Sequence, residues 1–330
     1  MARLSRWCAA LAAALAISLG VQSVPALAED ATFTVSRELA LTGLAADTNL
    51  GVYWAVADPT SSDLVALGPS GSVEGTMNLT QSVTSVQALA SRAGVLYVAD
   101  IGDPDASRTS VTVLRVGEPR YGEIVAREWS FSYSDGPHDA AAFGVSGRGN
   151  LYVITRGANP GVYRASAQPR TGVTNTLTRL GSAPAGVSDM TFLPDGSSMA
   201  VWAEGGLFLI NGFDLSVDAV APIARTGEAL TLGLEQRLIM LGAGGATPRV
   251  TANQRPTGMT SISPTPTPTP TPSPSPSPTA PATPEPTEQA TASARRTGTM
   301  LAIAGAGALA VLAGLATLLP RGGRHPRRGA

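Results

Sequence analysis

The sequence has few of the residues from which most hydrolytic and metal-dependent active sites are built. Its 330 residues include one cysteine, Cys8, and two histidines, His138 and His325. Cys8 lies in a segment that we expect to be cleaved off, so the mature chain should have no disulfide, thiolate metal site or cysteine nucleophile. Two histidines are too few for a histidine metal cluster and leave little scope for a Ser-His-Asp triad.

Charge is also scarce. Charged residues make up 14% of the chain, the formal net charge is −1, and no lysine is present. A typical domain is about one-quarter charged. Proteins that bind nucleic acid need a basic surface that neutralises phosphates. The composition therefore argues against a nucleic-acid partner.

Both ends of the chain carry targeting patterns. Residues 1–28 have a basic start, an apolar middle and an Ala-Leu-Ala ending at Ala28, which is typical of a cleaved secretory signal peptide. Thr299–Leu319 is a run of 21 uncharged residues, which at 1.5 Å per residue spans roughly 31 Å, the thickness of the hydrocarbon core. The arginine-rich tail 320–330 follows it. Together these patterns predict a single-pass type I protein in the cell membrane, with its main domain outside.

Two alternatives remain for these ends. Residues 1–28 could stay uncleaved as a membrane helix. Thr297-Gly298 before the apolar run resembles part of a cell-wall sorting motif but lacks the Leu-Pro of that motif. Wall anchoring is therefore the alternative location.

A stalk precedes the membrane segment. Residues 263–298 are rich in proline, threonine and serine, with alternating Thr-Pro and Ser-Pro pairs. Proline fixes φ and has no amide donor, so we expect extended polyproline II rather than a helix or sheet.

Residues 29–262 contain the sequence that we expect to fold into a compact ectodomain. A short apolar strand recurs there at intervals of 39 to 55 residues, with Gly, Pro, Asp and Asn between strands. Units of this length with three or four strands are typical of β-propeller blades. The five central strands are residues 51–56, 95–99, 150–154, 198–202 and 237–241.

The repeats predict an all-β fold, a β-propeller with five blades favoured and six possible. A β-sandwich is the other alternative. Residues 32–40 have no unit of their own, so we expect them to pair with the last unit and to close the ring. Trp54, Trp129 and Trp202 are expected to fill the core.

Alignment of the repeats places four polar residues at one equivalent position before the central strands. In a propeller the first strand of each blade lines the central channel, so these side chains are expected to converge. Converging carboxylates need a cation or hydrogen-bond donors, and calcium accepts such oxygen ligands. The alternative is that the acids cap backbone amides and bind nothing. The four channel candidates are Gln87, Asp139, Asp189 and Glu228.

A second acidic group, Asp100, Asp103 and Asp105, follows a strong strand. Acids at positions one, four and six with a glycine between them can surround a cation, although the spacing is not that of the helix-flanked calcium loop. The alternative is ordinary turn chemistry. His138 and Asp139 are adjacent, and adjacent strand residues face opposite ways, so they are not expected to form a catalytic pair.

Residues 96–103, then Val111–Val116 and Glu118-Pro119, resemble a family of secreted β-propellers from high-GC Gram-positive bacteria. The resemblance covers residues 84–195 and includes Arg108, His138-Asp139 and residues 151–155. The chain departs from the family pattern at Pro104, where the family has Asn, at Ala141, where it has Glu, and at Arg156, where Lys is usual. The family has no settled activity, so the resemblance implies a fold and a location but no reaction.

We therefore expect a binding or scaffolding module at the cell surface. Its partner would be an envelope protein or glycan, and Thr299–Leu319 would hold it in the membrane. One alternative is a calcium-dependent propeller hydrolase or lactonase that uses the acidic channel. Another is a structural, wall-spanning spacer. Binding is favoured because the sequence shows no paired nucleophile and base.

Overall fold

The computed structural model describes residues 31–260. The predicted signal peptide, stalk, membrane segment and basic tail lie outside these residues. Within residues 31–260 every regular element is a β-strand. In that range no helix has the length and hydropathy needed to span a membrane.

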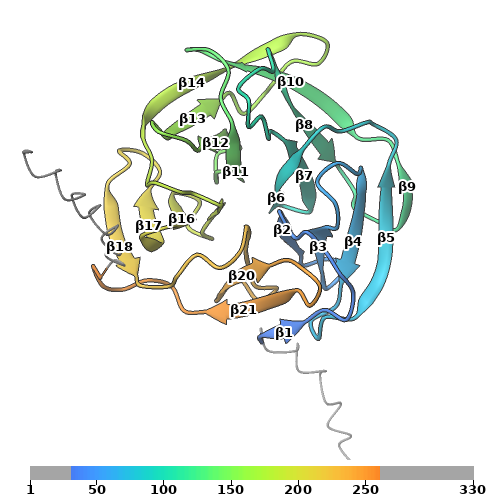
Figure 1. The fold of residues 1–330 in the computed structure, drawn as a ribbon. Coiled ribbons are helices and arrows are strands. Elements are labelled where there is room, and N and C mark those ends of the chain that lie inside the picture. The colour runs from blue at the N-terminus through green and yellow to red at the C-terminus, as the bar shows by residue number, and fades with distance from the viewer. Residues whose placement is uncertain (1–30, 261–330) are drawn as a thin grey trace, which may run out of the picture. The chain divides into compact units, whose positions relative to one another are not determined.

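Most strands form antiparallel groups in which consecutive strands pair, and Figure 1 shows the groups around a common centre. The first group contains β2 (Leu44–Asp47), β3 (Val52–Val56), β4 (Asp63–Leu67) and β5 (Val73–Leu79). The second contains β6 (Val86–Arg92), β7 (Val95–Asp100), β8 (Val111–Val116) and β10 (Arg127–Tyr133). The third contains β11 (Ala140–Val145), β12 (Leu151–Thr155), β13 (Gly161–Ala165) and β14 (Thr174–Ser182).

The remaining strands complete the circle. The fourth group contains β15 (Asp189–Phe192), β16 (Ser198–Ala203), β17 (Gly206–Asn211) and β18 (Val217–Ala221). The last contains β19 (Ala229–Leu232), β20 (Ile239–Ala243) and β21 (Arg249–Asn253), with β1 (Phe33–Thr34) at its edge. β1 pairs antiparallel with β21, Phe33 opposite Val250. The predicted pairing of residues 32–40 with the last unit is therefore confirmed.

Neighbouring groups are also joined at their outer strands. β5 pairs in parallel with β9 (Gly122–Ile124), and β10 pairs in parallel with β14. The second pairing makes one continuous eight-stranded sheet from two antiparallel groups. These parallel pairs cover strand edges that would otherwise be open to other chains.

The first strands of the groups form a closed ring. β2 contacts β6, β6 contacts β11, β11 contacts β15, β15 contacts β19, and β19 returns to β2. A β-sandwich has two stacked sheets instead, so that alternative does not describe this arrangement. The described residues form an all-β, propeller-like fold.

The core lies between neighbouring sheets. Every residue of β3 and of β12 is buried, because both faces of these strands are covered, and all of these residues except Thr155 are apolar. Trp54 and Trp202 are fully buried and Trp129 is 7% exposed, which confirms their predicted core role. The outer strand β14 differs, since Leu177 is its one buried residue and the others are exposed or partly exposed.

Candidate functional site

Arg156 directly follows β12 and joins three of the four predicted channel residues. Its Nε donates to Asp139 Oδ2 over 2.8 Å, and its Nη2 donates to Gln87 Oε1 over 2.6 Å. Its Nη1 lies 3.8 Å from Glu228 Oε2. Gln87, Asp139 and Glu228 come from the second, third and last strand groups, so Arg156 connects distant parts of the ring. We call Gln87, Asp139, Arg156, Arg225 and Glu228 the Arg156 cluster.

Other bonds hold the partners of Arg156 in place. Gln87 Nε2 donates to Ser85 Oγ over 2.9 Å, and Arg225 Nη1 lies 3.1 Å from Glu228 Oε1. Gln87 occupies a β-bulge, because the register of β6 against β7 shifts between Val86 and Ala88. A bulge re-aims a side chain out of the regular alternation. The bulge explains how a residue within β6 reaches Arg156.

Asp139 is the best-connected acid of the cluster. Its Oδ1 accepts from the backbone N–H of Asp103 over 2.7 Å, while Oδ2 accepts from Arg156. Its backbone oxygen accepts from the N–H of Arg156 over 2.9 Å. Asp139 therefore fixes the loop before β11 to the loops that follow β7 and β12.

Asp189, the fourth channel candidate, bonds to backbone N–H groups and not to Arg156. It is fully buried, and its carboxyl oxygens accept from the backbone N–H groups of Met190 and Leu230, each over 2.8 Å. Burial raises the pKa of Asp189 well above its usual value. The bonds from the backbone lower this pKa, but the burial and the negative charge of Glu228 outweigh them. Asp189 thus ties β15 to β19, which matches the capping alternative for this residue.

Two of the three acids in the 100–105 group bind nitrogen donors. Asp100 accepts from both Nη atoms of Arg108, at 3.1 and 3.0 Å, and from the N–H of Ser85 at 2.6 Å. Asp103 accepts from the N–H groups of Ser107 and Arg108 at 3.0 and 2.8 Å. Asp105 is exposed. Within residues 31–260, no group of three or more His, Cys, Asp or Glu side chains is placed to hold a metal ion.

A second polar group, which the sequence did not predict, lies in the loop between β10 and β11. His138 Nε2 is 3.0 Å from Asp135 Oδ1 and 2.9 Å from the hydroxyl of Tyr163, which itself donates to Asp135 Oδ2 over 2.8 Å. The ring of Tyr133 meets both the His138 and Tyr163 rings edge-on. His138 therefore pairs with Asp135, three residues earlier, and not with its neighbour Asp139.

The environment shifts several pKa values in this group. Burial and the hydrogen bond to Asp135 raise the pKa of Tyr163 to about 12. Burial works against ionisation of Asp135, but the bonds from Tyr163 and His138 outweigh it and lower the pKa of Asp135. The Tyr133 hydroxyl is buried and has no hydrogen-bond partner among the described residues, and burial raises its pKa strongly.

The Arg156 cluster combines positive and negative side chains with an amide. Its ionised groups, two guanidiniums and two carboxylates, balance in charge, and they are 19% to 39% exposed. Such a set offers both donors and acceptors at one end of the ring and suits a polar ligand that carries no strong net charge. The sequence analysis did not include Arg156 among the site residues, although this arginine directly follows one of the repeated strands.

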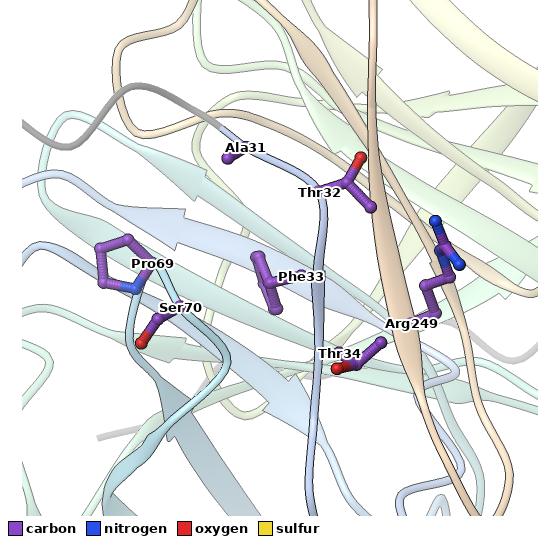
Figure 2. Close-up of a pocket in the computed structure, with 7 residues that line it drawn as sticks. All are labelled: Ala31, Thr32, Phe33, Thr34, Pro69, Ser70 and Arg249. Carbon is purple, nitrogen blue, oxygen red and sulfur yellow. The ribbon is translucent and has the colours of Figure 1, made fainter.

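A separate pocket lies where β1 joins the ring. It has a volume of about 660 Å³, and Figure 2 shows Phe33 between β1 and the turn that carries Pro69 and Ser70. Arg249 of β21 lies on its other side (Figure 2). None of its lining residues belongs to the Arg156 cluster, so the two sites are distinct.

Comparisons with known proteins concern the fold alone. No protein-family model and no curated protein matches this sequence. A solved gluconolactonase from Xanthomonas campestris aligns over 68% of this chain and 88% of its own, with 12% identity and a TM-score of 0.43. Another structure, provisionally described as a gluconolactonase, aligns over 70% and 92% with 14% identity and a TM-score of 0.36. Similarity at this level carries no argument about the activity of this chain.

Proposed function

We propose that the protein is a five-bladed β-propeller, anchored in the cell membrane, that works as a binding module on the outer side. The five first strands that contact one another in a ring support this number of blades. Each leads an antiparallel group of its own, and the parallel pairing of β10 with β14 joins two blades at their outer strands. The outside location and the type I anchor rest on the sequence patterns of residues 1–28 and Thr299–Leu319.

The Arg156 cluster is the proposed binding end. The observation that carries this proposal is the convergence of side chains from three blades on a single guanidinium. Groups that converge from separate elements onto one partly exposed point are characteristic of ligand sites. The balanced charge favours a hydroxyl-rich, uncharged ligand, such as a neutral envelope glycan, over a polyanion.

The test compares binding of a neutral cell-wall glycan fraction by the full-length protein in detergent with binding by Arg156→Gln. A hydrogen bond to a charged group is worth about 1.5–3 kcal/mol, so we expect affinity to fall about tenfold or more. Arg120→Gln, which changes an exposed arginine outside the cluster, should bind as the wild type does. Equal binding by Arg156→Gln, with an unchanged melting temperature, would refute the assignment of the site, whereas no binding by the wild type would favour the structural spacer.

A calcium-dependent hydrolase or lactonase is the second candidate, and the approach of Asp139 and Glu228 to one point favours it. Arg156, however, already supplies beside both carboxylates the positive charge that a cation would supply. We therefore rank binding first. Hydrolysis of gluconolactone by the full-length protein that calcium stimulates and Glu228→Gln abolishes would reverse this ranking.

A further inference from the structure

A cavity of about 410 Å³ lies at the opposite end of the ring from the Arg156 cluster. The cluster lies where the inner strands begin, whereas this cavity lies at the turns in which β11 and β15 end, together with the turn between β17 and β18. Its volume is in the range of small-molecule sites. We call it the Arg148 pocket, and its lining includes Arg148, Asn150, Tyr152, Arg164, Phe192, Asp195 and Phe213.

Two arginines give the Arg148 pocket a positive character. Arg148 and Arg164 are exposed, and neither forms an ion pair within residues 31–260. The acid in the lining, Asp195, is held inside its own turn. Its Oδ1 accepts from the N–H groups of Ser197 and Ser198 at 2.6 and 2.7 Å. The lining therefore has two guanidiniums and one carboxylate, which already accepts hydrogen bonds from its own turn. Its net positive charge can attract an anion.

An aromatic ring lies beside this charge. Phe213 is 69% exposed, one of the most exposed large apolar side chains of the described chain. The guanidinium of Arg148 lies over its ring, 5.5 Å from the ring centre. Behind it Tyr152 and Phe192 meet edge-on with ring centres 5.0 Å apart and form a buried wall. An exposed ring beside guanidiniums can stack on the apolar face of a sugar while the guanidiniums bind its acidic group.

The rim of the Arg148 pocket is built from turns that are fixed to one another. The N–H of Gly147 donates to the oxygen of Gly196, and the N–H of Gly212 donates to the oxygen of Ser197, each over 2.8 Å. A Cβ added at Gly147 would lie 2.8 Å from Gly196 Cα, so the two turns touch backbone to backbone. A rim that is already ordered loses little conformational entropy when a ligand binds.

We propose that the Arg148 pocket binds an acidic saccharide. Arg148 and Arg164 hold the carboxylate of the sugar, Phe213 stacks on its ring, and the side-chain amide of Asn150 bonds its hydroxyls. This site is independent of the proposed role of the Arg156 cluster, because it lies at the other end of the ring and shares no residue with it.

The experiment measures binding of trigalacturonic acid to the full-length protein in detergent by isothermal titration calorimetry. Maltotriose is the neutral probe, and inorganic phosphate is the anion without a sugar ring. With the proposed neutral-glycan site removed by Arg156→Gln, we expect trigalacturonic acid to bind at least tenfold more tightly than either. The Arg148→Gln/Arg164→Gln variant should lose at least tenfold in affinity, and Phe213→Ala about fivefold, with unchanged melting temperatures.

Two control variants separate this site from the rest of the molecule. Arg120→Gln should bind trigalacturonic acid as the wild type does, which excludes a general effect of surface charge. Arg156→Gln should also keep this binding, even if it loses the neutral glycan, so the two proposals can fail separately. Equal affinity of Arg156→Gln, which lacks the proposed neutral-glycan site, for trigalacturonic acid and for maltotriose or phosphate would overturn the proposal. Full affinity of the double arginine variant for trigalacturonic acid would also overturn it.

Discussion

The buried carboxyl of Asp189 makes the stability of this fold depend on pH in a direction opposite to that of most acids. Asp189 is fully buried between β15 and β19, and burial raises its pKa well above the usual 3.8. In the unfolded chain the group ionises near its usual value, whereas in the folded chain it holds its proton to higher pH. Its contribution to stability is therefore fully present below about pH 4 and is lost as pH rises through the raised folded pKa.

The variant Asp189→Asn removes this titration while keeping the shape of the side chain. It keeps one oxygen acceptor for the N–H groups of Met190 and Leu230, and its NH₂ group faces the other N–H. A buried donor left without an acceptor costs about 1–3 kcal/mol, so the variant should be less stable than the wild type at pH 4.

The difference in the free energy of unfolding between the wild type and Asp189→Asn should then become smaller as the pH rises. A difference of one bound proton changes the free energy of unfolding by about 1.4 kcal/mol per pH unit, which is the upper limit for the slope. Urea denaturation of both proteins between pH 4 and pH 8 measures the gap directly. Stability curves that stay parallel over this range would show that Asp189 does not titrate as its burial implies.

The exposed Asp214 supplies a control of opposite sign. Bonds from the N–H and hydroxyl of Ser216 lower its pKa, so its contribution is present above the usual value and is lost as pH falls. Asp214→Asn should therefore be slightly less stable than the wild type above about pH 5, and this difference in stability should disappear as the pH falls below about 4.

Three further predictions concern single contacts. Arg108→Gln leaves the buried carboxylate of Asp100 without its guanidinium. Removing one partner of a buried ion pair costs about 3–5 kcal/mol, which is an upper value here because Arg108 is partly exposed. Thermal unfolding of the variant and the wild type measures this loss of stability. Gly147→Ala forces apart two touching turns and should cost about 1–3 kcal/mol by urea denaturation. Gly258→Ala is the control and should cost much less, because a Cβ there would meet no atom within 4 Å. Tyr163→Phe removes a donor to Asp135, so the carboxyl of Asp135 should titrate at higher pH by NMR; an unchanged titration would contradict this.

The repeated strands could be predicted from the sequence because their burial is nearly complete. β3, β7 and β12 are covered on both faces, so each contains a run of at least four apolar residues that stands out from the Gly- and Asp-rich turns. The outer strands β5 and β14 were not predicted. β5 and β14 face solvent on one side, and their polar alternation resembles that of a loop. In sheets of this kind the inner strands are easier to predict from sequence than the outer ones.

The acidic residues show a different limit of sequence reasoning. Alignment of the repeats found Gln87, Asp139 and Glu228, which do meet at Arg156, but it placed Asp189 with them. Asp189 pairs in regular register with Trp202, whereas Gln87 occupies a bulge. A one-residue change of register turns a side chain to the other face of a strand. Sequence spacing does not contain that information.

Arginine side chains supply positive charge beside Asp100 and Asp139. The chain has 23 arginines and no lysine, and a guanidinium has several donors in a fixed fork. The guanidinium of Arg108 donates two hydrogen bonds to Asp100, and that of Arg156 donates to Asp139 and Gln87. A divalent cation would have to displace these donors before it could reach the carboxylate oxygens. We therefore expect the melting temperature to be the same with and without a chelator, and a lower value with the chelator would show that a cation and not Arg156 holds the acids together.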